Sequence, residues 1–255
     1  MSVATVAASG LLAAGGAFVM ARARTSHHAA TSVWHLVATA AGERKSARLS
    51  DGSVIELGPA STIRWTESDE RRDVELTGLA DFRVAHDSIR PFTVHARDAQ
   101  VTDIGTEFVV RAYASDSATR VSVLSGTIDL ARRTRRANQD TAARAASITL
   151  RAGDVGILGP SRVVRLAGAA SLVGDSAWLR GALRFDDVRL DDVAIELGRW
   201  FGASISIDDP GLSRRRVTAI YAHPELPSVV GAIAATVGAA VVRDGQSYHL
   251  RMRGR

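Results

Sequence analysis

Apolar residues alternate with polar residues in short runs between Ala47 and Leu158, and this pattern restricts the region to β-structure. Alternation at period two buries one face of a strand, whereas an amphipathic helix needs apolar residues three or four positions apart. Turn residues such as Asp51-Gly52 separate the runs, which recur about every ten residues. We therefore predict that residues 33–160 form an all-β sandwich or a short solenoid, in which 132–147 is a loop.

The region after these strands contains an internal repeat, in which Leu190 aligns with Leu226, 36 positions later. Within each copy apolar residues recur at i, i+3, i+4, i+7 and i+11, which is one face of a helix. Each copy closes on a glycine, Gly202 or Gly238, and glycine suits the left-handed position that ends a helix. The other aligned pairs are Val193/Val229, Ala194/Val230, Leu197/Ile233, Phe201/Val237, Ala203/Ala239 and Ile205/Val241.

This repeat predicts a small α+β domain over residues 177–255, joined to the β region by a linker at 161–176. Its helices are expected at 190–201 and 227–237. Its strands are expected at 183–186, 203–208, 216–222, 239–243 and 247–251.

The first 21 residues carry no charged side chain. At ~1.5 Å per residue a helix of this length would span the ~30 Å hydrocarbon core of a bilayer. The segment Ala21-Arg22-Ala23 resembles a signal-peptide cleavage site, although no basic residue precedes the apolar run. We predict that residues 1–24 are a transmembrane anchor or a signal peptide, with a soluble helix as a third alternative. Residues 25–32 would be a polar tether, and two arginines after the run do not decide its orientation.

The formal net charge of +5 raises the question of nucleic-acid binding. Almost all of the positive charge is arginine, because Lys45 is the only lysine, and it is spread among acidic residues. The one dense basic tract, at 132–136, contains no aromatic side chain on which a base could stack. We interpret that tract as a solvated loop, with contact to anionic lipid headgroups as the alternative, and we expect no nucleic-acid partner.

Catalytic and metal-binding candidates are few. The chain has no cysteine, which excludes disulfides and thiolate metal sites. No serine in a nucleophile-elbow setting accompanies the histidines, and paired aspartates near a helix start are favoured there electrostatically without any metal. We therefore predict that the protein is not an enzyme and binds no cofactor or metal. The groups considered are His27-His28, His86 with Asp87, His95 with Asp98, Asp186-Asp187 and Asp191-Asp192.

Several motifs resemble those of the FecR family. Arg90-Pro91-Phe92-x-Val94 is followed by Gly105-Thr106-x-Phe108-x-Val110, in the order and spacing typical of that family. Later in the chain, Trp178-x-x-Gly181-x-Leu183-x-Phe185 and the helix repeat resemble its C-terminal domain, which is similar to the short N-terminal domain of secretins and TonB-dependent receptors. The resemblance covers about residues 33–255. Leu79 departs from it, since the family usually has Glu at this position.

The resemblance implies a signalling relay. A TonB-dependent outer-membrane receptor loaded with an iron chelate would present its periplasmic signalling domain to this protein. A cytoplasmic extracytoplasmic-function sigma factor would be controlled in response. We expect a single-pass inner-membrane protein with most of the chain in the periplasm. The family's cytoplasmic anti-sigma domain does not precede the apolar run, so the sigma factor would be reached only through a missing or separate cytoplasmic part.

The strand predicted at 216–222 is our candidate for the receptor contact. Exposed strand edges can pair with a partner's strand, and the alternating side chains Val217, Ala219 and Tyr221 would supply selectivity. The alternative is that these residues only complete the domain's own sheet. A rival function of another class is an envelope module that binds carbohydrate or peptidoglycan, which should expose aromatic side chains along a groove.

Overall fold

The computed structural model describes residues 34–67, 71–133, 147–167 and 169–253. These residues belong to one compact unit that spans 32–255. The predicted anchor or signal peptide (1–24) and tether (25–32) lie outside the described residues. Among the residues that are described, no helix is both long and apolar enough to cross a membrane.

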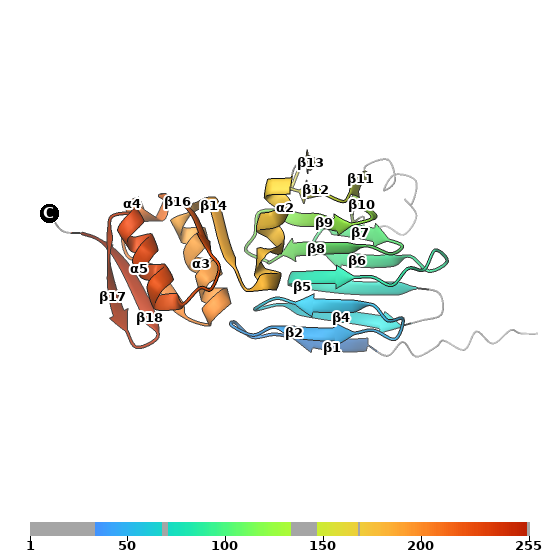
Figure 1. Cartoon of the computed structure of the whole chain (residues 1–255), viewed down its shortest axis with the longest axis horizontal. Helices are drawn as coiled ribbons and strands as arrows, with labels where there is room; N and C mark the ends of the chain where they lie inside the picture. The colour runs from blue at the N-terminus through green and yellow to red at the C-terminus, as the bar shows by residue number, and fades with distance from the viewer. Residues whose placement is uncertain (1–33, 68–70, 134–146, 168, 254–255) are drawn as a thin grey trace, which may run out of the picture. The chain divides into compact units, whose positions relative to one another are not determined.

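The first part of the described chain is built entirely from strands up to residue 167, as the alternation predicts (Figure 1). Thirteen strands join in one hydrogen-bonded sheet. They are β1 (Trp34–Ala38), β2 (Lys45–Arg48), β3 (Val54–Leu57), β4 (Thr62–Glu67), β5 (Arg72–Arg83), β6 (Phe92–Ala96), β7 (Ala99–Asp103), β8 (Glu107–Ala112), β9 (Thr119–Ser125), β10 (Thr127–Arg132), β11 (Ile148–Arg151), β12 (Asp154–Leu158) and β13 (Val163–Ala167).

The sheet folds into two layers that share strand β5. One layer runs β1-β4-β5-β6-β7-β10-β11, and the other runs β2-β3-β5-β8-β9-β12-β13. The first half of β5 pairs with β4 and β6, and its second half, from Gly78 onward, pairs with β3 and β8. Gly78 has φ +113°, and a Cβ there would lie 2.2 Å from the Oγ of Ser61. Only glycine therefore fits where the strand passes from one layer to the other.

The core of this sandwich lies between the two layers and collects the apolar residues of the alternating runs. Its largest members are aromatic: the ring of Phe82 stacks on Phe108 at 5.1 Å between centroids and meets Phe92 edge-on at 6.1 Å. All three side chains are fully buried. The rings come from β5, from β6 of one layer and from β8 of the other, so the two layers cannot separate without exposing them.

The segment predicted as a linker contains two regular elements. Strand β13 pairs with β12 along its whole length, and helix α2 (Ala169–Ser176) and the 3-10 helix η1 (Ala177–Arg180) follow it. Strand β13 was not predicted because it is short, with Val163 half-buried and Leu166 exposed, so it has no clear alternation. Most of the predicted loop, 134–146, lies outside the described residues.

The second part of the chain has the predicted succession of helices and strands (Figure 1). Gly202 and Gly238 follow the two long helices at φ +67° and +66°, as the repeat predicts. The short helix α4 is an addition that the repeat did not reveal. The elements are β14 (Leu183–Arg189), α3 (Leu190–Phe201), β15 (Ser204–Ile207), α4 (Pro210–Ser213), β16 (Arg216–Tyr221), α5 (Leu226–Thr236), β17 (Ala239–Asp244) and β18 (Ser247–Met252).

These elements form two small sheets around one core. Strands β14 and β16 pair antiparallel, while β15 and β17 flank β18, with β15 parallel to it. The repeated apolar positions of α3 and α5, among them Val193 and Val229, are buried together. The equivalence ends in the strands that follow, because Ile205 packs on the core whereas Val241 is exposed.

Candidate functional site

The strand predicted to contact a partner, β16, has one edge in the two-stranded sheet. It pairs with β14 on one side, and no strand of the described chain pairs with its other side. Val217 is buried, and Ala219 and Tyr221 pack partly buried against the core. These three side chains therefore stabilise the domain, and their role in partner binding remains a prediction.

The opposite face of β16 carries the side chains that a partner would meet. Thr218 is exposed, and Ile220 is 66% exposed, which is unusual for an isoleucine in a strand. Alternate residues of this strand face the core, and the apolar Ile220 lies on the other face, toward solvent. The sequence signal for this second face is the single apolar residue at a position that alternation assigns to solvent.

A network of charged groups joins the sandwich to helix α3. The carboxylate of Glu196 accepts from Arg111 of β8 at 2.8 Å and from Arg199, one turn away on its own helix, at 3.0 Å. Arg111 also donates to Asp116 at 3.0 Å. Both guanidinium groups lie over the ring of Tyr113, at 5.0 and 3.8 Å from its centroid.

Burial of Glu196 acts to raise its pKa, but the two guanidinium groups outweigh burial and hold the pKa of this carboxyl below its usual range. The same surroundings raise the pKa of Tyr113, chiefly through burial. The Tyr113 hydroxyl donates to the carbonyl of Pro59 at 2.7 Å. The Glu196 carboxylate is thus ionised at neutral pH and has two guanidinium partners, and removing one partner from such a partly buried ion pair is costly.

A second set of contacts lies beside this network. Arg44 donates to the carbonyl of Trp178 at 2.8 Å and stacks on Trp200 at 4.7 Å. The backbone N–H of Gly42 donates to the carbonyl of Arg199 at 2.7 Å, at the end of α3. Trp200 is therefore half-buried beneath an arginine rather than part of the central core.

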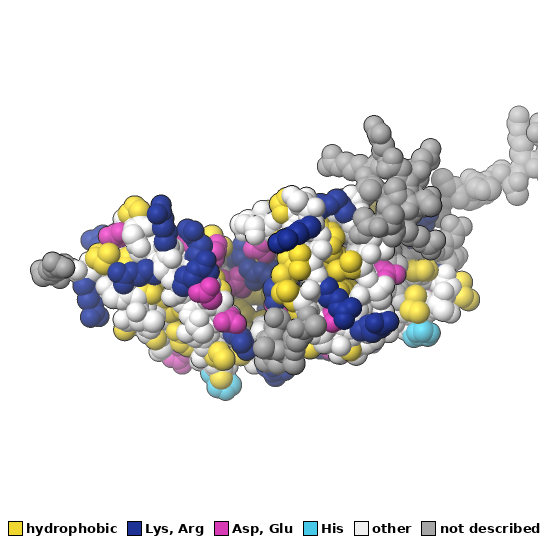
Figure 2. Space-filling model, turned by 90° about the horizontal axis from the view of Figure 1, so that it is seen from above, with side chains coloured by type: hydrophobic (Ala, Val, Ile, Leu, Met, Phe, Trp, Pro, Cys, Tyr) yellow, Lys and Arg dark blue, Asp and Glu magenta, His cyan; other side chains and the backbone are white. Residues whose placement is uncertain are grey.

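A cleft of about 480 Å³ is bounded by the outer face of β8 and β9, by α2 and η1, and by β14 and α3. Figure 2 shows the hollow with arginine and acidic side chains at its rim. Asp175 of α2 closes one side by accepting from Arg120 at 2.6 Å and from the hydroxyl of Ser122. The free edge of β14, including Arg184 and Asp186, forms another side.

Sequence reasoning did not find this network or this cleft. Arg111 and Glu196 are 85 residues apart in the chain, and nothing in the sequence pairs them. The only local signal is the spacing of Glu196 and Arg199, which places them on one helix face.

Several of the residues considered for acid–base or metal chemistry lie in separate ion pairs. The Nε2 of His95 lies 3.7 Å from the carboxylate of Asp73. Asp98, considered as the partner of His95, instead pairs with Arg132. Asp87 pairs with Arg90. Of the paired aspartates, Asp187 contacts Arg216 and Asp191 contacts Arg189. In the part of the chain that is described, no three His, Asp or Glu side chains are grouped as a metal ion would need.

Comparison with solved structures supports the same fold. A crystal structure at 2.50 Å resolution of a proposed anti-sigma factor from Parabacteroides distasonis ATCC 8503 has a TM-score of 0.75 and 25% sequence identity, covering 87% of this chain and 100% of that one. A second, at 1.65 Å resolution and from the same organism, has a TM-score of 0.74 and 24% identity, covering 86% of this chain and 100% of that one. At that identity the second likeness shows the fold alone.

Family comparison gives two matches and no curated relative. The family described as "FecR protein" matches residues 35–129, and the family described as "FecR, C-terminal" matches residues 182–249. No curated protein sequence matches significantly. Together the two matches cover more than half of the chain, in the order in which the sandwich and the α+β domain occur. The chain therefore belongs to the FecR family of regulators.

Proposed function

We propose that this protein is the sensor part of a FecR-type regulator, which receives a signal in the periplasm from a TonB-dependent outer-membrane receptor. In this proposal the α+β domain binds the receptor's periplasmic signalling domain. The bound state then alters the control of an extracytoplasmic-function sigma factor through a cytoplasmic part. Uptake of an iron chelate is the process that such a relay would serve.

The open edge of β16 is the observation that carries the proposal. A two-stranded sheet leaves backbone N–H and C=O groups available for one more strand, and main-chain pairing of that kind gives affinity without any metal or nucleotide. The exposed Ile220 beside this edge would add apolar contact in the bound state.

Two proline substitutions distinguish the free edge of β16 from the edge that pairs with β14. Successive N–H groups of a strand point to opposite edges, so Thr218→Pro and Ala219→Pro remove donors from the two edges in turn. One of them breaks pairing with β14 and lowers the melting temperature. We expect the other to leave the melting temperature within a few degrees of the wild type and to abolish receptor-dependent transcription from a sigma-factor reporter.

The reporter experiment uses the chromosomal gene, so that any cytoplasmic part is present. Transcription induced by the ligand-loaded receptor is measured in both variants, with protein levels followed by immunoblot. If the well-folded proline variant responds to the receptor as the wild type does, pairing at the β16 edge is not how the signal is received.

The rival envelope-binding function has less support in the described residues. Trp65 and Trp178 are buried, and Trp200 is covered by Arg44. Trp34 is exposed, but Arg64 lies over its ring at 4.8 Å from the centroid. A carbohydrate groove would instead present open aromatic faces in a row.

A further inference from the structure

One end of the sandwich gathers exposed apolar side chains on loops. Ile89, between β5 and β6, is 89% exposed, and Ile104, between β7 and β8, is 46% exposed. The two loops touch, because the N–H of Asp87 donates to the carbonyl of Ile104 at 2.9 Å. Two adjoining loops therefore place exposed isoleucines at the same end of the sandwich, and apolar side chains gathered at one place mark a surface that can contact a partner or a membrane.

The loop that carries Ile89 is held in shape. One carboxylate oxygen of Asp87 accepts from the N–H groups of Ile89 and Arg90, both at 3.0 Å, and the other accepts from the Arg90 side chain at 2.8 Å. The buried Arg72 donates to the carbonyls of Arg90 and Ala85, at 2.7 and 2.9 Å. Ile89 is therefore presented by a fixed loop, and exposing it is a property of the folded state.

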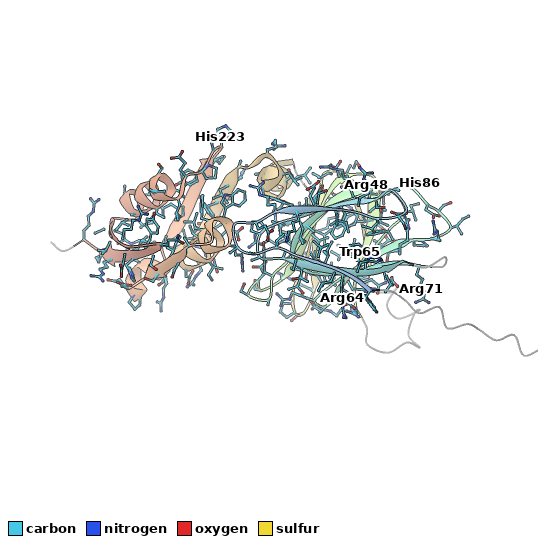
Figure 3. All side chains as sticks on the ribbon, turned by 90° about the horizontal axis from the view of Figure 1, so that it is seen from below. Arg48, Arg64, Trp65, Arg71, His86 and His223 are labelled. Carbon is cyan, nitrogen blue, oxygen red and sulfur yellow. The ribbon has the colours of Figure 1, made fainter. Side chains whose placement is uncertain are left out.

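The same end is where the described chain begins. Trp34 lies opposite Thr66 of β4, and the next residue of that strand, Glu67, lies opposite Arg72 of β5. Arg72 is the residue that holds the Ile89 loop, so Trp34 and the loop share one end. Trp34 is itself 52% exposed. Figure 3 shows Arg71 and His86, from the neighbouring loops, at this end as well.

Chain length restricts how far this end can be from a membrane. Twelve residues, 22–33, separate the uncharged run from Trp34. Fully extended, they reach at most ~40 Å. Two half-buried carboxylates at this end have cationic partners, since Asp87 pairs with Arg90 and Glu107 with Arg83. An apolar tip with paired charges and a half-exposed tryptophan suits the interfacial zone of a bilayer.

We propose that Ile89, Ile104 and Trp34 form a membrane-docking tip, which dips into the headgroup region of the bilayer that anchors the chain. The partner is a phospholipid surface, and its role is to fix the sandwich on the membrane with the α+β domain available to the receptor. The inference rests on the proposed anchor in residues 1–24.

The absence of cysteine makes a direct test possible, because a single introduced thiol is the only one in the chain. Ile89→Cys carries a nitrobenzoxadiazole label, and Ile220→Cys, at an isoleucine 66% exposed in the α+β domain, is the matched control. The full chain is reconstituted into vesicles of phosphatidylethanolamine and phosphatidylglycerol. We expect blue-shifted emission and quenching by nitroxide lipids at position 89 and neither at position 220.

Three other outcomes have distinct meanings. A chain that does not float with the vesicles contradicts the anchor. A chain that floats but shows the same aqueous emission at both positions overturns the docking tip alone. A blue shift at position 89 that needs no lipid and grows with protein concentration assigns the tip to protein–protein association, and also overturns it.

A second measurement uses the fragment 32–255, which matches the whole of a crystallised relative and is one compact unit. Removing one inserted isoleucine should weaken binding to the same vesicles about tenfold. We therefore expect Ile89→Ser to lower the vesicle partition coefficient about tenfold and Ile220→Ser to leave it unchanged. Equal effects of both substitutions would contradict the proposal.

Discussion

The buried Arg72 holds distant parts of the chain together, and no local sequence pattern predicts its contacts. Arg72 is 6% exposed, pairs with Asp51 at 2.8 Å and donates to carbonyls of the loop between β5 and β6. We predict that Arg72→Met lowers the free energy of unfolding by about 3–5 kcal/mol, because Asp51 is left without its cation. Arg72→Lys keeps the charge but not the planar fork, so urea unfolding should give an intermediate loss. Equal stability of all three proteins would contradict this role.

Asp81 gives a pH dependence of the opposite kind to most carboxylates. Burial, with repulsion from Glu107, raises its pKa to about 7, and neither carboxylate oxygen has a hydrogen-bond partner among the described residues. A raised folded-state pKa means that the unfolded chain releases its proton first, so stability falls as pH rises from about 4 to about 7. We expect Asp81→Asn to remove up to roughly 4 kcal/mol of this fall. Melting temperatures of both proteins between these pH values provide the check, and parallel curves would contradict it.

At the scale of elements, the crossing of β5 between layers depends on one glycine. Gly78 and Gly52 both have positive φ, but a Cβ at Gly78 would strike Ser61 whereas one at Gly52 would meet open space. Gly52→Ala should therefore cost about 1 kcal/mol, from backbone strain alone. We predict a loss at least twice as large for Gly78→Ala, measured as the difference in unfolding free energy. Equal losses would show that the layers do not depend on this close approach.

The elements also show what sequence periodicity can and cannot predict. Helices α3 and α5 and most strands follow from spacing, because one buried face imposes a period on the residues that line it. Strand β13 is too short and too exposed to have a period. The crossing at Gly78, the hydrogen bonds of Arg72 and the pairing of Arg111 with Glu196 join positions far apart in the chain, so no local pattern encodes them. The strand β16 could be predicted from its sequence, but the sequence did not show that Val217, Ala219 and Tyr221 face the core while Ile220 faces solvent.

At the scale of the whole molecule, the first question is on which side of a membrane the chain lies. Residues 25–255 are proposed to be periplasmic. Alkaline phosphatase fused after Arg255 should then be active in a bacterial host, and the fusion should sediment with membranes. Fusions that are inactive at several positions after Arg24, although made at normal levels, would contradict this topology.

Binding at the α+β domain can affect the sandwich only if the contacts between the two parts hold them together. Glu196 holds Arg111 of the sandwich and Arg199 of its own helix. Glu196→Ala removes a carboxylate that contacts both guanidinium groups, so we expect one thermal transition in the wild type and two in the variant. Calorimetry that shows one unchanged transition would mean that the network does not couple the parts.

The central claim is reception of a receptor's signal. The most direct measurement is calorimetric titration of the full chain with the periplasmic signalling domain of a TonB-dependent receptor from the same organism. We predict saturable one-to-one binding that is unchanged by a metal chelator or by nucleotide and is lost in the well-folded proline variant of β16. A folded sample that gives no binding at high micromolar concentrations of the signalling domain would contradict the claim.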